Sequence, residues 1–175
     1  MLFVDLEMAC WEDRVPNTGE IIEIGICEVD VVKLEITRKA QYYVKPENDE
    51  VSEFCTKLTG ITPRKILKQG RPLREVMRTI EKNYGGINKT FCAWGSDDKT
   101  LMDELAQKDI EFKMGRYIDL ANLYRLLKGE SKASTQLDAM KDYGLSFEGR
   151  QHSGVVDAEN LARLYIEIMR GFRKD

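Results

Sequence analysis

The segment FVDLEMAC (residues 3–10) carries two carboxylates within a stretch that otherwise has the pattern of a β-strand. Val4, Leu6 and Met8 alternate with Asp5 and Glu7, as in a strand with one buried face. Side chains two residues apart in a strand point to the same side, about 6–7 Å apart. Such a pair offers the hard oxygen ligands that Mg²⁺ prefers, although two carboxylates in a strand can equally face water. Alone, this motif is a weak indication of chemistry.

A second acidic pair lies in AWGSDDKTLM (residues 93–102), where a predicted buried strand passes into a helix. Sites are often built at the carboxyl ends of strands, so Asp97 and Asp98 are candidates for the same site. Asp is also a preferred N-cap residue. Helix capping is therefore an alternative for either residue.

The single histidine of the chain, His152, precedes Asp157 by five residues around the start of the last predicted helix. An imidazole has an unperturbed pKa of about 6.5, so it can accept a proton at neutral pH. The pair could also be an exposed loop residue and a carboxylate favoured by the helix dipole.

These residues must be positioned by elements that the hydrophobic pattern predicts. Strands are expected at the N-terminus, at 22–26 and over 34–44, and their short connections suggest an antiparallel meander. Two more strands are expected at 89–94 and 115–120. Helices are expected at 52–60, from Thr62-Pro63, from Pro72 to Gly85-Gly86, at about 97–108, and at 120–128, 134–143 and 156–171. This order predicts one α/β domain over residues 1–175, with helices covering a mixed sheet.

Composition excludes several classes of protein. The chain has 42% hydrophobic residues and a formal net charge of −3, as an ordinary globular protein would. It contains no run of about 18 apolar residues and no signal-peptide pattern, so we expect no membrane partner. The four cysteines form no CxxC pair, which disfavours a zinc site and fits a cytoplasmic location.

Taken in chain order, the motifs D-x-E, D and H-x₄-D resemble the DEDD exonuclease superfamily, in its histidine subtype (DEDDh). The chain is most similar to the Eri-like and KapD-like 3′–5′ exonucleases, where the first motif reads D-x-E-x-x-C, as DLEMAC does here. A segment like FCTKLTGI (54–61) follows the third strand in that branch. Its last motif, FEGRxHSGxxDAxNxARL, is matched at 147–164. The resemblance spans most of the chain and implies a ribonuclease H-like fold.

This resemblance implies hydrolysis of single-stranded nucleic acid from its 3′ end to nucleoside 5′-monophosphates. Two Mg²⁺ or Mn²⁺ ions would stabilise the attacking and leaving oxygens and neutralise carboxylates that otherwise repel one another. The implied metal ligands are Asp5, Glu7, Asp98 and Asp157. Glu7 also counts as catalytic, together with His152 as general base. RNA is the favoured polymer because the nearest relatives by motif act on RNA, and DNA is the alternative.

The second motif leaves one assignment open. Similar family members carry G-x-x-D, and counting from Gly95 selects Asp98, with Leu101 and Met102 facing the core three and four residues later. Asp97 then occupies a slot where relatives often have an aromatic residue that contacts the terminal base. The resemblance also implies a terminal-nucleotide pocket framed by Met8, Ala9, Leu58, Thr59 and Ile61.

Basic residues gather in the predicted helical region at 57–82. Arg71, Arg74, Arg78 and Lys82 recur at helical spacing, opposite an apolar face. They could contact the phosphates of a bound strand, or form only a solvated helix face.

Two readings from other classes remain. A catalytically silent nucleic-acid-binding adaptor on the same fold is disfavoured because every catalytic position keeps a reactive residue. A phosphatase of the haloacid dehalogenase type needs D-x-D, and Glu7 stands where its second Asp belongs.

Overall fold

A five-stranded sheet organises the chain in the computed structural model, which describes residues 1–15, 18–129 and 134–173. The strand order is β3-β2-β1-β4-β5, with β1 Leu2–Met8, β2 Ile21–Asp30, β3 Glu35–Tyr43, β4 Phe91–Ala93 and β5 Tyr117–Asp119. The first three strands pair antiparallel, while β4 is parallel to β1 and β5 is parallel to β4. The predicted mixed sheet, with its meander and parallel strands, is confirmed.

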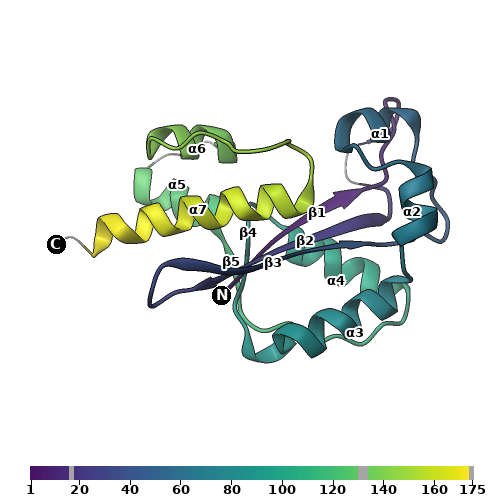
Figure 1. Cartoon of the computed structure of the whole chain (residues 1–175), viewed down its shortest axis with the longest axis horizontal. Coiled ribbons are helices and arrows are strands. Elements are labelled where there is room, and N and C mark those ends of the chain that lie inside the picture. Colours follow the sequence, from purple (N-terminus) through teal and green to yellow (C-terminus); the bar gives the residue numbers. More distant parts are fainter. Residues whose placement is uncertain (16–17, 130–133, 174–175) are drawn as a thin grey trace.

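Helices cover both faces of this sheet (Figure 1). One face carries α7 Gly154–Phe172 with α5 Leu120–Lys128 and α6 Gln136–Asp142, and the other carries α3 Leu73–Tyr84 and α4 Asp97–Gln107. Two short helices, α1 Glu53–Thr59 and α2 Pro63–Gln69, lie beside the carboxyl end of β1, and a 3₁₀ turn, η1, spans Gly86–Asn88. The last helix begins two residues before the predicted start at 156.

Alternation along β1 divides its side chains between the two faces. Val4 is buried in the cluster formed with α3 and α4, and Leu6 packs against that cluster. Phe3 belongs to the second cluster, beneath α7. Asp5 and Glu7 therefore project toward the α7 face, as the sequence pattern predicts.

Local capping fixes the short helix α1 next to the end of β1. The Ser52 hydroxyl accepts from Cys55 N and donates to the Cys10 carbonyl at 2.6 Å, so the cap also joins the helix to the segment after β1. The helix ends at Gly60, whose φ of 75° lies in the left-handed region that glycine tolerates. Among the described residues, none of the helices combines the length and the apolar composition that a membrane span requires.

Candidate active site

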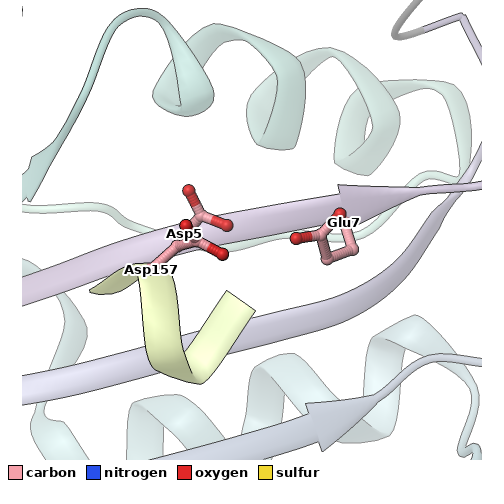
Figure 2. A group of neighbouring side chains, drawn as sticks. All are labelled: Asp5, Glu7 and Asp157. Atoms are coloured by element: carbon pink, nitrogen blue, oxygen red, sulfur yellow. The ribbon is translucent and has the colours of Figure 1, made fainter. Parts of the chain in front are cut away.

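Three carboxylates meet between β1 and the first turn of α7. Asp5 and Glu7 come from the strand and Asp157 from the helix, and one ligand oxygen of each lies within 4.8 Å of the others. Figure 2 shows the side chains gathered in the space between these two elements. Residues 152 positions apart in sequence thus form one acidic cluster.

Two glycines allow α7 to approach the sheet this closely. A Cβ on Gly25, the residue paired with Asp5, would lie 1.9 Å from the carbonyl carbon of Gly154, and one on Gly154 would lie 3.0 Å from the Asp5 carbonyl oxygen. Glu23, which is buried and pairs with Glu7 across the sheet, accepts the N–H of Val155 at 3.1 Å. The helix terminus is therefore fixed directly above β1 and β2.

Burial and mutual repulsion raise the pKa values of the acids in this cluster. Burial, followed by the charges of Asp97 and Asp157, raises the pKa of Asp5 well above its usual value. Burial, followed by Asp157 and Glu23, raises the pKa of Glu7 to about 8. The main charges that act on Asp5 and Glu7 belong to carboxylates. A hard divalent cation would supply the missing positive charge with oxygen ligands alone, so the residues present fit Mg²⁺ or Mn²⁺.

Asp97 and Asp98, adjacent and both half-buried in the first turn of α4, are the candidates for a fourth carboxylate. Strand β4 pairs with β1 only at Leu2 and Phe3, so the rest of β1 has an open side. Burial raises the pKa of the Asp97 carboxyl to about 7, and the nearby backbone N–H of Leu6, on that side of β1, acts in the opposite direction. Of the two acids, Asp97 is the one whose charge acts on both Asp5 and Glu7. The spacing from Gly95 had selected Asp98, which is half-buried one residue further along the helix.

His152 lies at the rim of the cluster. Its side chain is exposed and its backbone φ is 59°, a left-handed conformation. The carboxylate of Asp157 accepts the N–H of Ser153, the next residue, at 2.9 Å. The loop is therefore tied to one of the three clustered acids immediately after the histidine.

A cleft of about 490 Å³ opens over the carboxylates. The residues that line it include Asp5, Glu7, Asp157 and His152, together with Met8, Leu58, Phe54, Cys10, Trp11, Glu12 and Arg14. Its volume is in the range of ordinary ligand pockets, roughly 300–1,000 Å³. The cleft thus brings acids, imidazole and apolar side chains to a single space.

The predicted nucleotide pocket is only partly reproduced by this cleft. Met8 and Leu58 line it, whereas Ala9, Thr59 and Ile61 are each at most 4% exposed and face the interior. The Thr59 hydroxyl donates to the Cys55 carbonyl and accepts from Ile61 N, so it completes the end of α1. None of these three residues is among those that line the cleft.

Sequence reasoning missed Phe54, Trp11 and Glu23. Phe54 stands one helical turn before Leu58 on α1, and both are more than a third exposed, so their i, i+4 spacing was the available signal. Glu23 lies between Ile22 and Ile24 in the second strand as Asp5 lies between Val4 and Leu6 in the first, so a carboxylate in strand alternation was the available signal.

The basic residues at 71–82 lie away from this cleft. Helix α3 covers the opposite face of the sheet from α7 (Figure 1). Arg74 donates to the carbonyls of Lys108 and Asp109, and Arg71 donates to the Thr79 hydroxyl. Arg78 and Lys82 are exposed on that far layer. The structure favours the solvated-face interpretation of this stripe.

Fold and site together define the class of protein. It is a mixed α/β domain whose central strand carries clustered carboxylates suited to binding divalent cations. Comparison with known proteins identifies the family. The sequence profile of the family described as "Exonuclease" (RNase_T) matches residues 2–165, and the chain belongs to this family.

Individual relatives agree with this assignment. The chain is 30% identical to the 3′-5′ exonuclease Snipper of Drosophila melanogaster over 97% of this chain and 69% of that protein. It is 28% identical to ERI1 exoribonuclease 2 of Xenopus laevis over 94% of this chain, but only 27% of that protein. This chain thus corresponds to about a quarter of the Xenopus relative.

A solved structure shows the same architecture. The nuclease domain of 3′hExo, a DEDDh family member bound to rAMP, superimposes with a TM-score of 0.86 at 25% identity, over 97% of this chain and 91% of that one. The resemblance to DEDDh exonucleases and the ribonuclease H-like fold are both confirmed.

Proposed function

We propose that this chain is a 3′–5′ exonuclease that releases nucleoside 5′-monophosphates from single-stranded RNA with the help of Mg²⁺ or Mn²⁺. The observation that carries the proposal is the convergence of Asp5, Glu7 and Asp157 within 4.8 Å, in a cleft that His152 also lines. RNA is the first choice because ERI1 exoribonuclease 2 of Xenopus laevis, to which the chain is similar, is named an exoribonuclease. DNA is the alternative polymer for the same chemistry.

Each group in the cleft has a part in this reaction. Asp5, Glu7 and Asp157 would hold the cations, joined from α4 by Asp97, whose charge acts on the cluster, or by Asp98, which the spacing from Gly95 selects. The cations would stabilise charge on the attacking and leaving oxygens of the phosphodiester. His152 accepts the proton of the attacking water, as a general base exposed at the rim can. Met8, Phe54 and Leu58 offer apolar contact to the terminal nucleotide.

The test is hydrolysis of 5′-end-labelled RNA and DNA oligonucleotides of equal sequence, with Mg²⁺, with Mn²⁺ and with EDTA. We expect a ladder shortening from the 3′ end, faster for RNA, abolished by EDTA and by Asp157→Asn. The matched control is Asp142→Asn, an exposed aspartate on α6, which should leave the rate unchanged.

Two outcomes would refute the proposal. Binding without hydrolysis under every metal condition would indicate the silent adaptor. Turnover of p-nitrophenyl phosphate with intact oligonucleotides would indicate a phosphatase. Faster degradation of DNA than RNA would overturn only the choice of polymer.

A further inference from the structure

The loop that carries His152 has an unusual backbone. Gly149 has φ of 90° and His152 has φ of 59°, and the left-handed region is unfavourable for a residue with a Cβ. A conformation of this kind persists only where surrounding contacts hold it. The contacts of residues 148–153 therefore decide where the imidazole stands.

Both ends of this loop are anchored to α7. At the first end, Glu148 N donates to Asn160 Oδ1 at 3.0 Å, and Asn160 Nδ2 donates to the Glu148 carbonyl at 2.9 Å. At the other end, Ser153 N donates to Asp157 at 2.9 Å. Between these anchors, Arg150 reaches away from α7: its Nη2 donates to the carbonyls of Lys57 at 2.8 Å and Leu58 at 3.3 Å.

The end of α1 is shaped to receive this guanidinium. The last carbonyls of a helix lack intrahelical partners and carry the negative end of the helix dipole, which favours a cation. A Cβ on Gly60 would lie 2.4 Å from Arg150 Nη1 and 2.9 Å from its Cζ. The bare glycine backbone at φ 75° therefore lets the guanidinium lie against the helix end.

This contact joins two segments that line the same cleft. Helix α1 presents Phe54 and Leu58 to the cleft, and the loop presents His152 to it. We propose that Arg150 is a positioning residue. By binding the carboxyl end of α1, it fixes the position of His152 relative to Phe54 and Leu58, which would contact the terminal nucleotide. The proposal rests on the base role of His152 given above.

A double-mutant cycle tests it, because a residue that acts only through another has no effect once the other is removed. Arg150→Gln should lower kcat on an RNA oligonucleotide by about tenfold, the size expected for loss of charge-assisted hydrogen bonds. In the His152→Ala background the same substitution should leave kcat unchanged. Arg150→Lys keeps the charge but not the fork that spans two carbonyls, so we expect it to restore only part of the rate.

The matched control is Arg173→Gln. Arg173 likewise donates to two successive carbonyls, those of Val31 and Val32, at the far end of α7. It should change kcat in neither background. Amide exchange in the metal-free protein gives a second measurement: exchange across 148–153 should be about tenfold faster in Arg150→Gln and unchanged in Arg173→Gln.

Three results would overturn the proposal. They are an unchanged kcat in Arg150→Gln, an equal drop in the His152→Ala background, and an unchanged exchange rate across the loop. Full turnover in His152→Ala alone would refute the base role, and this proposal with it, while leaving the metal-site assignment standing. Failure of the two proposals is thus distinguishable.

Discussion

Replacing Glu7 by Gln should stabilise the metal-free protein at pH 8 while removing its activity. Glu7 is 8% exposed, and burial raises its pKa from 4.5 to about 8, with further contributions from Asp157, Glu23 and Asp97. In the unfolded chain the carboxyl returns to about its ordinary value. Between about pH 4.5 and pH 8 the folded state therefore keeps a proton on Glu7 that the unfolded state has lost.

The sign of the pH dependence follows from this difference in bound protons. Where the folded state binds more protons, stability falls as pH rises, so the metal-free protein should lose stability from about pH 5 to pH 8. A difference of about 3.5 pKa units corresponds to at most roughly 5 kcal/mol. Part of this free energy arises from repulsion by Asp157 and Glu23. We therefore expect Glu7→Gln to raise the free energy of unfolding at pH 8 by about 2–3 kcal/mol.

The assay is thermal unfolding in EDTA at pH 5 and pH 8. For a chain of this size, 2–3 kcal/mol corresponds to a rise in Tm of about 5–10 °C. The rise should appear at pH 8 and nearly vanish at pH 5, where Glu7 keeps its proton. With saturating Mg²⁺ or Mn²⁺ the order should reverse, because the wild-type carboxylate then gains a cation partner and the amide does not.

Asp5 and Asp97 also have raised pKa values, but both are present in wild type and in Glu7→Gln, so the difference in Tm between the two proteins reports on Glu7. Glu20, paired with Lys108, has a pKa lowered to about 2, so its stabilisation is lost only as pH falls below about 4.5. Glu50→Gln, at an exposed position, is the control for loss of one surface charge. Equal Tm values for wild type and Glu7→Gln at pH 8 without metal would show that the Glu7 carboxylate is not destabilised by burial and by the neighbouring carboxylates.

Three further predictions concern the roles of single residues. Asp97→Asn should abolish hydrolysis while Asp98→Asn only weakens it, and the reverse result would restore the assignment by spacing from Gly95. His152→Ala should lower kcat by roughly 10²–10⁴ and leave oligonucleotide binding in Ca²⁺ nearly unchanged; loss of binding instead would contradict a base role. Replacing Arg74 and Arg78 together by Gln should leave the slope of log Kd against log salt unchanged, since their helix lies on the far face; a slope flatter by about one unit would place phosphates there.

Local patterns predicted the sheet well because its strands carry their own signals. The alternation of Val4 and Leu6 with Asp5 and Glu7 predicted both the first strand and the face that its acids share. The start of α7 was predicted two residues late, because Gly154 is a poor helix former. Its place in the helix follows from tertiary contact with Gly25, which local pattern does not reveal.

The finer site depended on which atoms face the cleft, and spacing alone did not determine this. Asp97 and Asp98 are adjacent, so a one-residue difference in helix phase exchanges their roles. The family segment at 54–61 contains both cleft-lining and buried positions, and a resemblance between sequences does not separate them. The basic stripe had the expected helical spacing, but its helix packs on the other side of the sheet.

Departures from ordinary folding rules coincide at this site. Carboxylates occupy the buried face of a central strand, a histidine adopts a left-handed backbone, and Gly25 and Gly154 bring helix and sheet into backbone contact. Each departure is unfavourable alone, and together they bring the carboxylates and the histidine to one place. The close glycine contact brings Asp157 within 4.8 Å of Asp5 and Glu7, and Asp157 in turn binds the loop that turns at His152. Because sequences are otherwise locally consistent with their folds, this concentration of unfavourable features at one place is the physical argument that they serve chemistry rather than stability.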